Sequence, residues 1–263
     1  MRAKPWMALA CAAAVLLAAC DRGATRRGDG RAVTGEDRFT GSLTVFAAAS
    51  LTEAFTDVET KLEADNENFD LTYSFGGSGA LITQIEQGAP ADVVATADET
   101  QLDALRDKGW VEQPVTLAGN RLEILVAKGN PKHIAGLADL GRPDVLFVAA
   151  DGSVPAGKYA MEALRRAGVT VAPKSRELDV KAAAGKVIVG EADATIVYVT
   201  DVRAAGARAE GIAIPDAQNV TARYGIAVVA RSRHRQAARA FVDYLVRGAG
   251  QHMLRRRGFV GAT

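Results

Sequence analysis

The sequence predicts an α/β protein built from two lobes. Apolar, β-branched segments alternate along the chain with segments in which apolar residues recur at helical spacing. This alternation indicates parallel strands joined by right-handed helical crossovers. Two longer strand patterns, at 120–127 and 222–229, separate two such series. We therefore expect each lobe to be a mainly parallel sheet flanked by helices, with two hinge strands crossing between the lobes.

The first series alternates strands and helices three times. A strand pattern at 43–48 precedes an amphipathic helix at 52–64, with an apolar face that includes Phe55 and Leu62. The further elements are a strand at 71–75, a helix at 80–87, a strand at 91–96 and a helix at 99–107 that Gly109 ends.

The second series lies between the two hinge patterns. It is predicted to contain a strand at 145–149, helices at 157–167 and 180–189, and a strand at 194–199. Helices at 235–247 and 251–256 follow the second hinge strand. We expect the first lobe to comprise 41–121 and 225–263 and the second lobe 122–224.

The N-terminal segment has a targeting pattern. Arg2 and Lys4 precede an apolar run that is too short to span a membrane. The run ends in Leu17-Ala18-Ala19-Cys20, which resembles the lipobox of bacterial lipoproteins, where the cysteine carries the lipid. Ordinary cleavage beside a chance cysteine is the alternative. We predict a signal peptide at 1–19 and lipidation of Cys20.

The segment 20–40 is rich in Gly, Arg, Asp and Thr and is expected to be a flexible tether. Asp21, directly after the cysteine, resembles an inner-membrane retention signal. The only other cysteine, Cys11, lies in the predicted signal peptide, so the folded body can form no disulfide. The formal net charge is +1, and it falls to −1 without residues 1–19. No basic stripe dominates, which argues against a nucleic-acid partner.

Ser50 and Ser78 each lie at a predicted strand-to-helix turn. A helix N-terminus presents free backbone N–H groups and a positive dipole end, and two such turns facing one point form a neutral anion-binding cup. Ser50 is followed three residues later by Glu53, so a helix-capping box is the structural alternative. Ser78 lies among Gly76, Gly77 and Gly79, which permit close backbone approach, and a flexible turn is the alternative there.

Three positions of the second series offer further donors. Pro155 and Ala156 begin a helix, where proline fits the first turn. Asp179 is the expected N-cap of the helix that starts with Val180. Tyr198 is near the end of the strand at 194–199, and a buried hydroxyl there needs a partner. An ordinary helix start and a packing residue are the structural alternatives.

Several enzyme and cofactor patterns fail. The nucleophile elbow of hydrolases breaks at Ala80, and none of His133, His234 and His252 ends a predicted strand where a base is needed. The Gly-Lys pairs are not followed by Ser or Thr, which excludes a Walker loop. No residues show metal-ligand spacing. We therefore expect no enzyme and no cofactor.

Taken together, these segments resemble the periplasmic molybdate-binding proteins of bacterial ABC importers, which have the type II periplasmic-binding-protein fold. The resemblance spans about residues 42–260. It is carried by Phe46-Ala47-Ala48-Ala49-Ser50-Leu51, Phe75-Gly76-Gly77-Ser78, Gly88-Ala89-Pro90-Ala91-Asp92, Gly119-Asn120, Val154-Pro155-Ala156-Gly157, Ile196-Val197-Tyr198 and Arg257-Gly258-Phe259.

The resemblance implies an oxyanion site made by two serines, two backbone amides and a tyrosine. Matched motif by motif, these are Ser50, Ser78, the amides of Ala156 and Val180, and the Tyr198 hydroxyl. The chain departs from some relatives by having glycines around Ser78, and Asp151-Gly152 where Asp-Pro is often seen.

The resemblance implies capture of molybdate, and of tungstate with it, for the membrane permease of an ABC importer. We expect a monomer, lipid-anchored on the outer face of the cytoplasmic membrane. A cup of donors favours a fully deprotonated anion, and size would separate molybdate from the smaller sulfate. Sulfate, phosphate or a small organic acid remain alternative ligands, although an organic acid would favour an arginine clamp that these turns lack.

Overall fold

The computed structural model describes residues 39–261. The predicted signal peptide, Cys20 and nearly all of the predicted tether lie outside the described residues. The helices are α1 (Thr52–Asp65), α2 (Ser78–Glu86), α3 (Glu99–Asp107), α4 (Pro155–Arg166), α5 (Val180–Ile188), α6 (Val199–Ala205), α7 (Arg235–Arg247) and α8 (Gly250–Arg257). The strands are β1 (Gly41–Ala48), β2 (Phe69–Gly76), β3 (Val93–Thr96), β4 (Val115–Ala127), β5 (Ala149–Ala150), β6 (Arg176–Glu177), β7 (Ala194–Tyr198), β8 (Ala209–Ala213) and β9 (Thr221–Val228).

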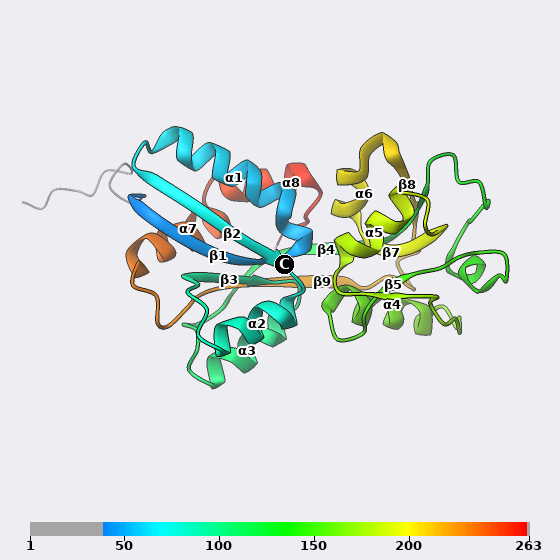
Figure 1. The fold of residues 1–263 in the computed structure, drawn as a ribbon, viewed down its shortest axis with the longest axis horizontal. Helices are drawn as coiled ribbons and strands as arrows, with labels where there is room; N and C mark the ends of the chain where they lie inside the picture. Colours follow the sequence, from blue (N-terminus) through cyan, green and yellow to red (C-terminus); the bar gives the residue numbers. More distant parts are fainter. Residues whose placement is uncertain (1–38, 262–263) are drawn as a thin grey trace, which may run out of the picture. The chain divides into compact units, whose positions relative to one another are not determined.

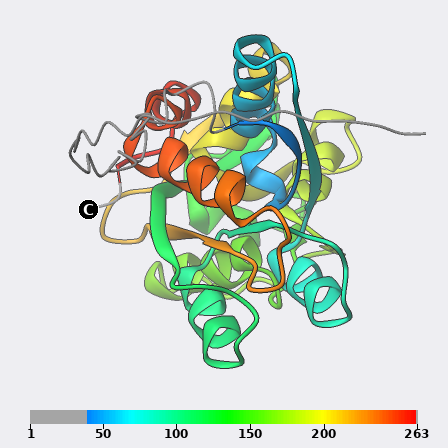
Figure 2. The ribbon, with the colours of Figure 1, turned by 90° about the vertical axis from the view of Figure 1, so that its left-hand side faces the viewer.

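The first lobe is a sheet with helices on both faces (Figures 1 and 2). Its strands run in the order β2-β1-β3-β9-β4, in which β2, β1 and β3 pair in parallel and β9 is antiparallel to its neighbours. Along β1, Val45 packs in one core cluster with Phe55 of α1 and Phe241 of α7, whereas Phe46 packs in another with Leu81 of α2. Burial of both faces explains the continuous apolar run of this strand.

The second lobe is built around the C-terminal half of β4. This half pairs antiparallel with β7 and β8, while β5 and β6 pair in parallel. An isolated parallel bridge joins Phe147, in the segment that precedes β5, to Ala194 of β7. Each lobe is therefore a mixed sheet in which one hinge strand runs against the others, which refines the expectation of mainly parallel sheets.

Two strands run between the lobes (Figure 1). Residues 115–121 of β4 pair with β9, and residues 122–127 pair with β7 and β8, so the ladder changes partners between Arg121 and Leu122. β9 returns beside β4 over 221–226 and pairs with β3 over 225–228. These are the two crossings that the sequence predicts.

Most predicted elements are found, with differences at their ends. The helices at 99–107 and 235–247 have the predicted bounds, and Asp98 caps α3 by accepting a hydrogen bond from the Thr100 N–H. The predicted strand at 145–149 is wrong in extent, because only 149–150 form a ladder. The helix at 80–87 begins earlier, at Ser78, and α6, β6 and β8 were not predicted.

Candidate functional site

A small cavity between the two lobes contains all five residues that the resemblance singles out. The volume that a water centre can occupy is about 20 Å³, slightly more than the ~10–15 Å³ that one water needs. Its wall is made by Ala48, Ala49, Ser50, Gly76, Gly77, Ser78 and Ala97 from the first lobe, and by Val154, Pro155, Ala156, Asp179, Val180 and Tyr198 from the second. The structure thus brings the five together from turns far apart in sequence.

Three α-helices begin at this cavity. Ser78 is the first residue of α2, Ala156 is the second of α4, and Val180 is the first of α5. A fourth turn, the 3-10 segment Ala49–Leu51, leads into α1 beside them. The first N–H groups of a helix have no acceptor within the helix, and its N-terminus is positively polarised. The cavity is therefore surrounded by free main-chain donors and aligned dipoles.

Ser50 does not cap α1, so the capping-box alternative is wrong. It lies within the 3-10 turn, and the N-cap position of α1 is Leu51, without a side-chain capping bond. The Ser50 hydroxyl oxygen instead lies 2.7 Å from the hydroxyl oxygen of Tyr224. Glu53, the other half of the expected box, forms an ion pair with Lys181, 2.6 Å away. The Ser50 hydroxyl can therefore serve the cavity.

Ser78 is also buried in the first-lobe part of the wall. Its hydroxyl oxygen accepts a hydrogen bond from the Ala97 N–H at 3.2 Å, so its own proton remains available to a ligand. Gly77, the N-cap of α2, has extended backbone angles, and the glycine is required here by space. A Cβ atom at Gly77 would lie 2.8 Å from the carbonyl oxygen of Leu178 and 3.0 Å from Val154 Cγ1.

The positions of the Ala156 and Val180 amides are determined by the N-termini of α4 and α5. Pro155 occupies the first turn of α4, as predicted, and Asp179 caps α5 by accepting from the Ala182 N–H at 2.9 Å. Gly157 allows α4 to pack closely, because a Cβ there would lie 2.0 Å from the Asp151 carbonyl oxygen. These local contacts leave the Ala156 and Val180 N–H groups at the cavity wall.

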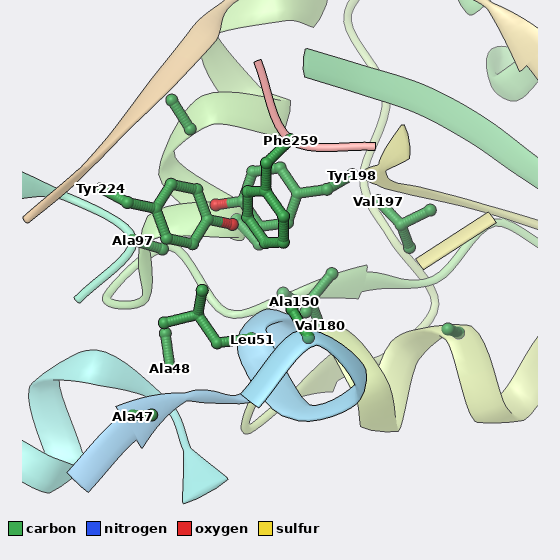
Figure 3. Packing of buried hydrophobic residues seen from close by; sticks show 14 of the residues in the cluster. Ala47, Ala48, Leu51, Ala97, Ala150, Val180, Val197, Tyr198, Tyr224 and Phe259 are labelled. Atoms are coloured by element: carbon green, nitrogen blue, oxygen red, sulfur yellow. The ribbon is translucent and has the colours of Figure 1, made fainter. Parts of the chain in front are cut away.

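Tyr198 contributes a buried hydroxyl with no hydrogen-bond partner among the described residues. Its ring lies edge to face against Tyr224, with 5.8 Å between ring centroids (Figure 3). Burial raises the pKa of Tyr198 well above its ordinary value, so the phenol is a neutral donor. An unpaired buried hydroxyl is costly unless a ligand accepts its proton.

The cavity wall holds no lysine, arginine or histidine side chain. Asp179 is the one carboxylate of the wall, and from the sequence it was predicted only as a helix N-cap. Two ion pairs join the lobes around the cavity: Glu53 with Lys181 at 2.6 Å, and Asp98 with Lys158 at 2.7 Å. The cationic side chains of these two pairs lie beside the cavity and are each paired with a carboxylate, whereas the hydrogen-bond donors in the cavity wall are neutral.

Two polar residues behind the cavity were not predicted as functional. Asn120 on β4 and Tyr224 on β9 are both fully buried on the hinge strands. Both crossing strands carry other polar residues, so a polar residue in a strand pattern does not single these two out; Asn120 belongs to the Gly119-Asn120 motif, which is the sequence signal that could have identified it.

Residues 39–261 show neither a metal site nor a membrane-spanning helix. No group of three or more His, Cys, Asp or Glu side chains there could hold a metal ion. In the same range, no helix is long and apolar enough to cross a bilayer.

Comparison with known proteins places this geometry in context. A profile of the family described as bacterial extracellular solute-binding protein matches residues 43–260. The molybdate-binding protein ModA of Mycobacterium tuberculosis H37Rv is 39% identical over 219 residues, covering 83% of this chain and 84% of the relative.

Two solved structures share the fold. The periplasmic molybdate-binding protein of Azotobacter vinelandii matches with a TM-score of 0.73 at 19% identity, over 84% of this chain and 100% of that one. The sulfate-binding protein SubI of M. tuberculosis H37Rv matches with a TM-score of 0.72 at 22% identity, over 83% and 86%. Because these two are named for different anions, the fold alone does not select the ligand.

Proposed function

Because the chain belongs to the family of bacterial extracellular solute-binding proteins, it is a binding protein that works outside the cytoplasm, and we propose that it captures molybdate there for an ABC importer. It is not an enzyme, and it needs no resident cofactor. The 39% identical relative is named for molybdate. Tungstate has nearly the same size and charge, and we propose it as a second ligand of the same site.

The observation that carries this proposal is the convergence of three helix N-termini and an unpaired phenol on one cavity whose wall holds no cationic side chain. A tetrahedral dianion would accept from the Ser50 and Ser78 hydroxyls on one side. From the other side it would accept from the Ala156 and Val180 amides and the Tyr198 hydroxyl. Helix dipoles and oriented amides stabilise the charge without a cation in contact.

The chemistry of the cavity argues against the alternative ligands. Its wall offers no arginine or lysine to clamp a carboxylate, which disfavours an organic acid. Sulfate is smaller than molybdate and would leave some buried donors unpaired. Monohydrogen phosphate carries a proton that needs an acceptor; the Ala156 and Val180 amides offer none, and Oδ1 of Asp179, the one carboxylate of the wall, already accepts from the Ala182 N–H.

A thermal-shift titration of the purified protein with molybdate, tungstate, sulfate and phosphate tests the proposal. A ligand at a hundred times its Kd adds about 2.7 kcal/mol to the free energy of unfolding. For a protein of this size that raises Tm by roughly 5–10 °C. We expect this rise with molybdate and tungstate only. A rise with sulfate and none with molybdate would overturn the proposed ligand.

Ligand capture requires the lobes to separate and close. We propose that they comprise 41–121 with 225–263, and 122–224, and that β4 and β9 bend between them as a hinge. The ion pairs Glu53–Lys181 and Asp98–Lys158 would form on closure, since each joins one residue from either lobe. The closed pair of lobes would be the surface that the permease recognises. Small-angle scattering should show a smaller radius of gyration with molybdate than without it.

We further propose that the protein is a monomer anchored by a lipid on Cys20, on the periplasmic face of the cytoplasmic membrane in a Gram-negative cell. Support comes from the Leu17-Ala18-Ala19-Cys20 pattern and from Asp21 after it. Cys20→Ala should release the protein from the membrane fraction, and mass spectrometry of the N-terminal peptide should find the lipid in the parent protein. Light scattering after gel filtration should give the mass of one chain.

A further inference from the structure

A buried polar chain leads from the hinge strands to Ser50. The Tyr224 hydroxyl oxygen lies 2.7 Å from that of Ser50, and Asn120 Nδ2 donates to the same Tyr224 oxygen over a longer 3.5 Å. Asn120 Nδ2 also donates to Thr200 Oγ1 at 2.9 Å. Tyr224 and Asn120 are fully buried, so water does not compete for these bonds.

The direction of the protons along this chain is fixed at its Asn120 end. Asn120 Oδ1 accepts from the Arg121 N–H at 2.9 Å, so the amide presents its Nδ2 hydrogens to Tyr224 and Thr200. A hydroxyl has one proton. If Ser50 donates its proton to an anion, its oxygen must be the acceptor in the hydrogen bond with Tyr224. Tyr224 must then be the donor.

Tyr224 is suited to that single orientation. Its ring packs edge to face against Tyr198, at 5.8 Å, and against Phe259, at 5.3 Å between centroids (Figure 3). Burial raises the pKa of Tyr224 well above its ordinary value, so the phenol keeps its proton. The cavity wall itself includes Ser50 and Tyr198 but not Tyr224, which acts from behind it.

We propose that Tyr224 is a positioning residue for the anion site: it donates to Ser50 and thereby directs the Ser50 proton into the cavity. The order of donation is Asn120 to Tyr224, Tyr224 to Ser50, and Ser50 to the anion. Each bond polarises the next, which strengthens the last donor. This inference rests on the proposed function, because it assigns a role within the same anion site.

The test is a double-mutant cycle on molybdate affinity, measured by isothermal titration calorimetry. Tyr224→Phe removes one oxygen atom and should weaken binding about three- to tenfold, the net effect of one hydrogen bond. In a Ser50→Ala background the same change should have a much smaller effect, because the proposed role of Tyr224 is exercised through Ser50. An equal loss in both backgrounds, or unchanged affinity in the single variant, would overturn the inference.

Tyr73→Phe is the matched control. The Tyr73 hydroxyl is also buried, has no hydrogen-bond partner among the described residues and lies outside the cavity wall. Its removal should leave molybdate affinity unchanged, and a loss equal to that of Tyr224→Phe would also overturn the inference.

If Tyr224→Phe does not fold, 4-aminophenylalanine at position 224, which keeps the ring and a donor, must retain parent affinity. Failure of the parent protein to bind molybdate would instead contradict the proposed function itself.

Discussion

Gly77 of the first lobe faces the main-chain carbonyl of Leu178 in the second lobe, so closely that a methyl group on Gly77 would lie 2.8 Å from that oxygen. The contact joins Gly77, the N-cap of α2 in the cavity wall, to the residue that precedes Asp179, the N-cap of α5. The closure that we propose would therefore require the absence of a side chain at this position.

Gly77→Ala should weaken molybdate binding at least tenfold while changing the Tm of the ligand-free protein little. The backbone angles of Gly77 suit alanine, so only the closed arrangement is obstructed. Gly79→Ala is the control, since its nearest atom would be the Ser153 carbonyl oxygen at 3.9 Å. Titration calorimetry of both variants checks this, and equal affinity of the two would contradict it.

Tyr198→Phe should separate binding from stability. The Tyr198 hydroxyl is buried and unpaired, so its removal should leave the ligand-free protein as stable as before, or more stable. The same change removes one of the five proposed donors and should raise the molybdate Kd about tenfold. Thermal unfolding with and without molybdate measures both effects. A less stable ligand-free variant with unchanged Kd would show that the hydroxyl is structural.

Asp179→Asn should tighten anion binding severalfold. Asn caps a helix about as well as Asp, so α5 should keep its N-terminus and the free energy of unfolding should change by less than about 0.5 kcal/mol. The change removes the one carboxylate of the cavity wall and thus its repulsion of a dianion. Kd measurements at low and moderate salt test this, and weaker binding would show that Asp179 accepts a proton from the ligand.

Asp201 should make stability fall as the pH rises. Burial raises the pKa of Asp201 from 3.8 to about 6, while Lys181, 3.3 Å away, opposes this. The folded state then binds the proton more tightly than the unfolded state. The stability from this group is complete below about pH 4 and is lost as the pH rises through about 6.

Asp201→Asn removes that titration and can keep an acceptor for the Tyr198 N–H, which Asp201 Oδ2 accepts at 3.1 Å. Between pH 4 and 7 the parent protein should lose about 2 kcal/mol of unfolding free energy relative to the variant. Urea unfolding of both proteins across this range measures the difference. Parallel pH profiles would show that Asp201 has an ordinary pKa.

Helices and strands could be predicted from the sequence where the local residue pattern alone determines the secondary structure. Helical periodicity ending at Gly109 predicted α3, and β1 was recognisable because both its faces are buried. The short helix α6 was missed because Val199 and Thr200 extend the apolar, β-branched run of β7. Local patterns cannot distinguish such a helix start from the end of a strand.

The site was predictable only in part, for a related reason. Its five donors lie in short motifs that resemble a known family. The partner of Ser50 could not be found this way, because Tyr224 is 174 residues away and the two meet only through the packing of β9 against the first lobe. The same distance explains why a capping box remained the alternative at Ser50, whose hydroxyl contacts a residue far away in the sequence.

Location of the bound metal atom tests the central claim most directly. Crystals of the protein grown with molybdate should show one strong anomalous molybdenum peak in the cavity. We predict that its oxygens accept hydrogen bonds from Ser50, Ser78, Ala156, Val180 and Tyr198. A fully occupied molybdenum site elsewhere in the chain, with this cavity empty, would contradict the account.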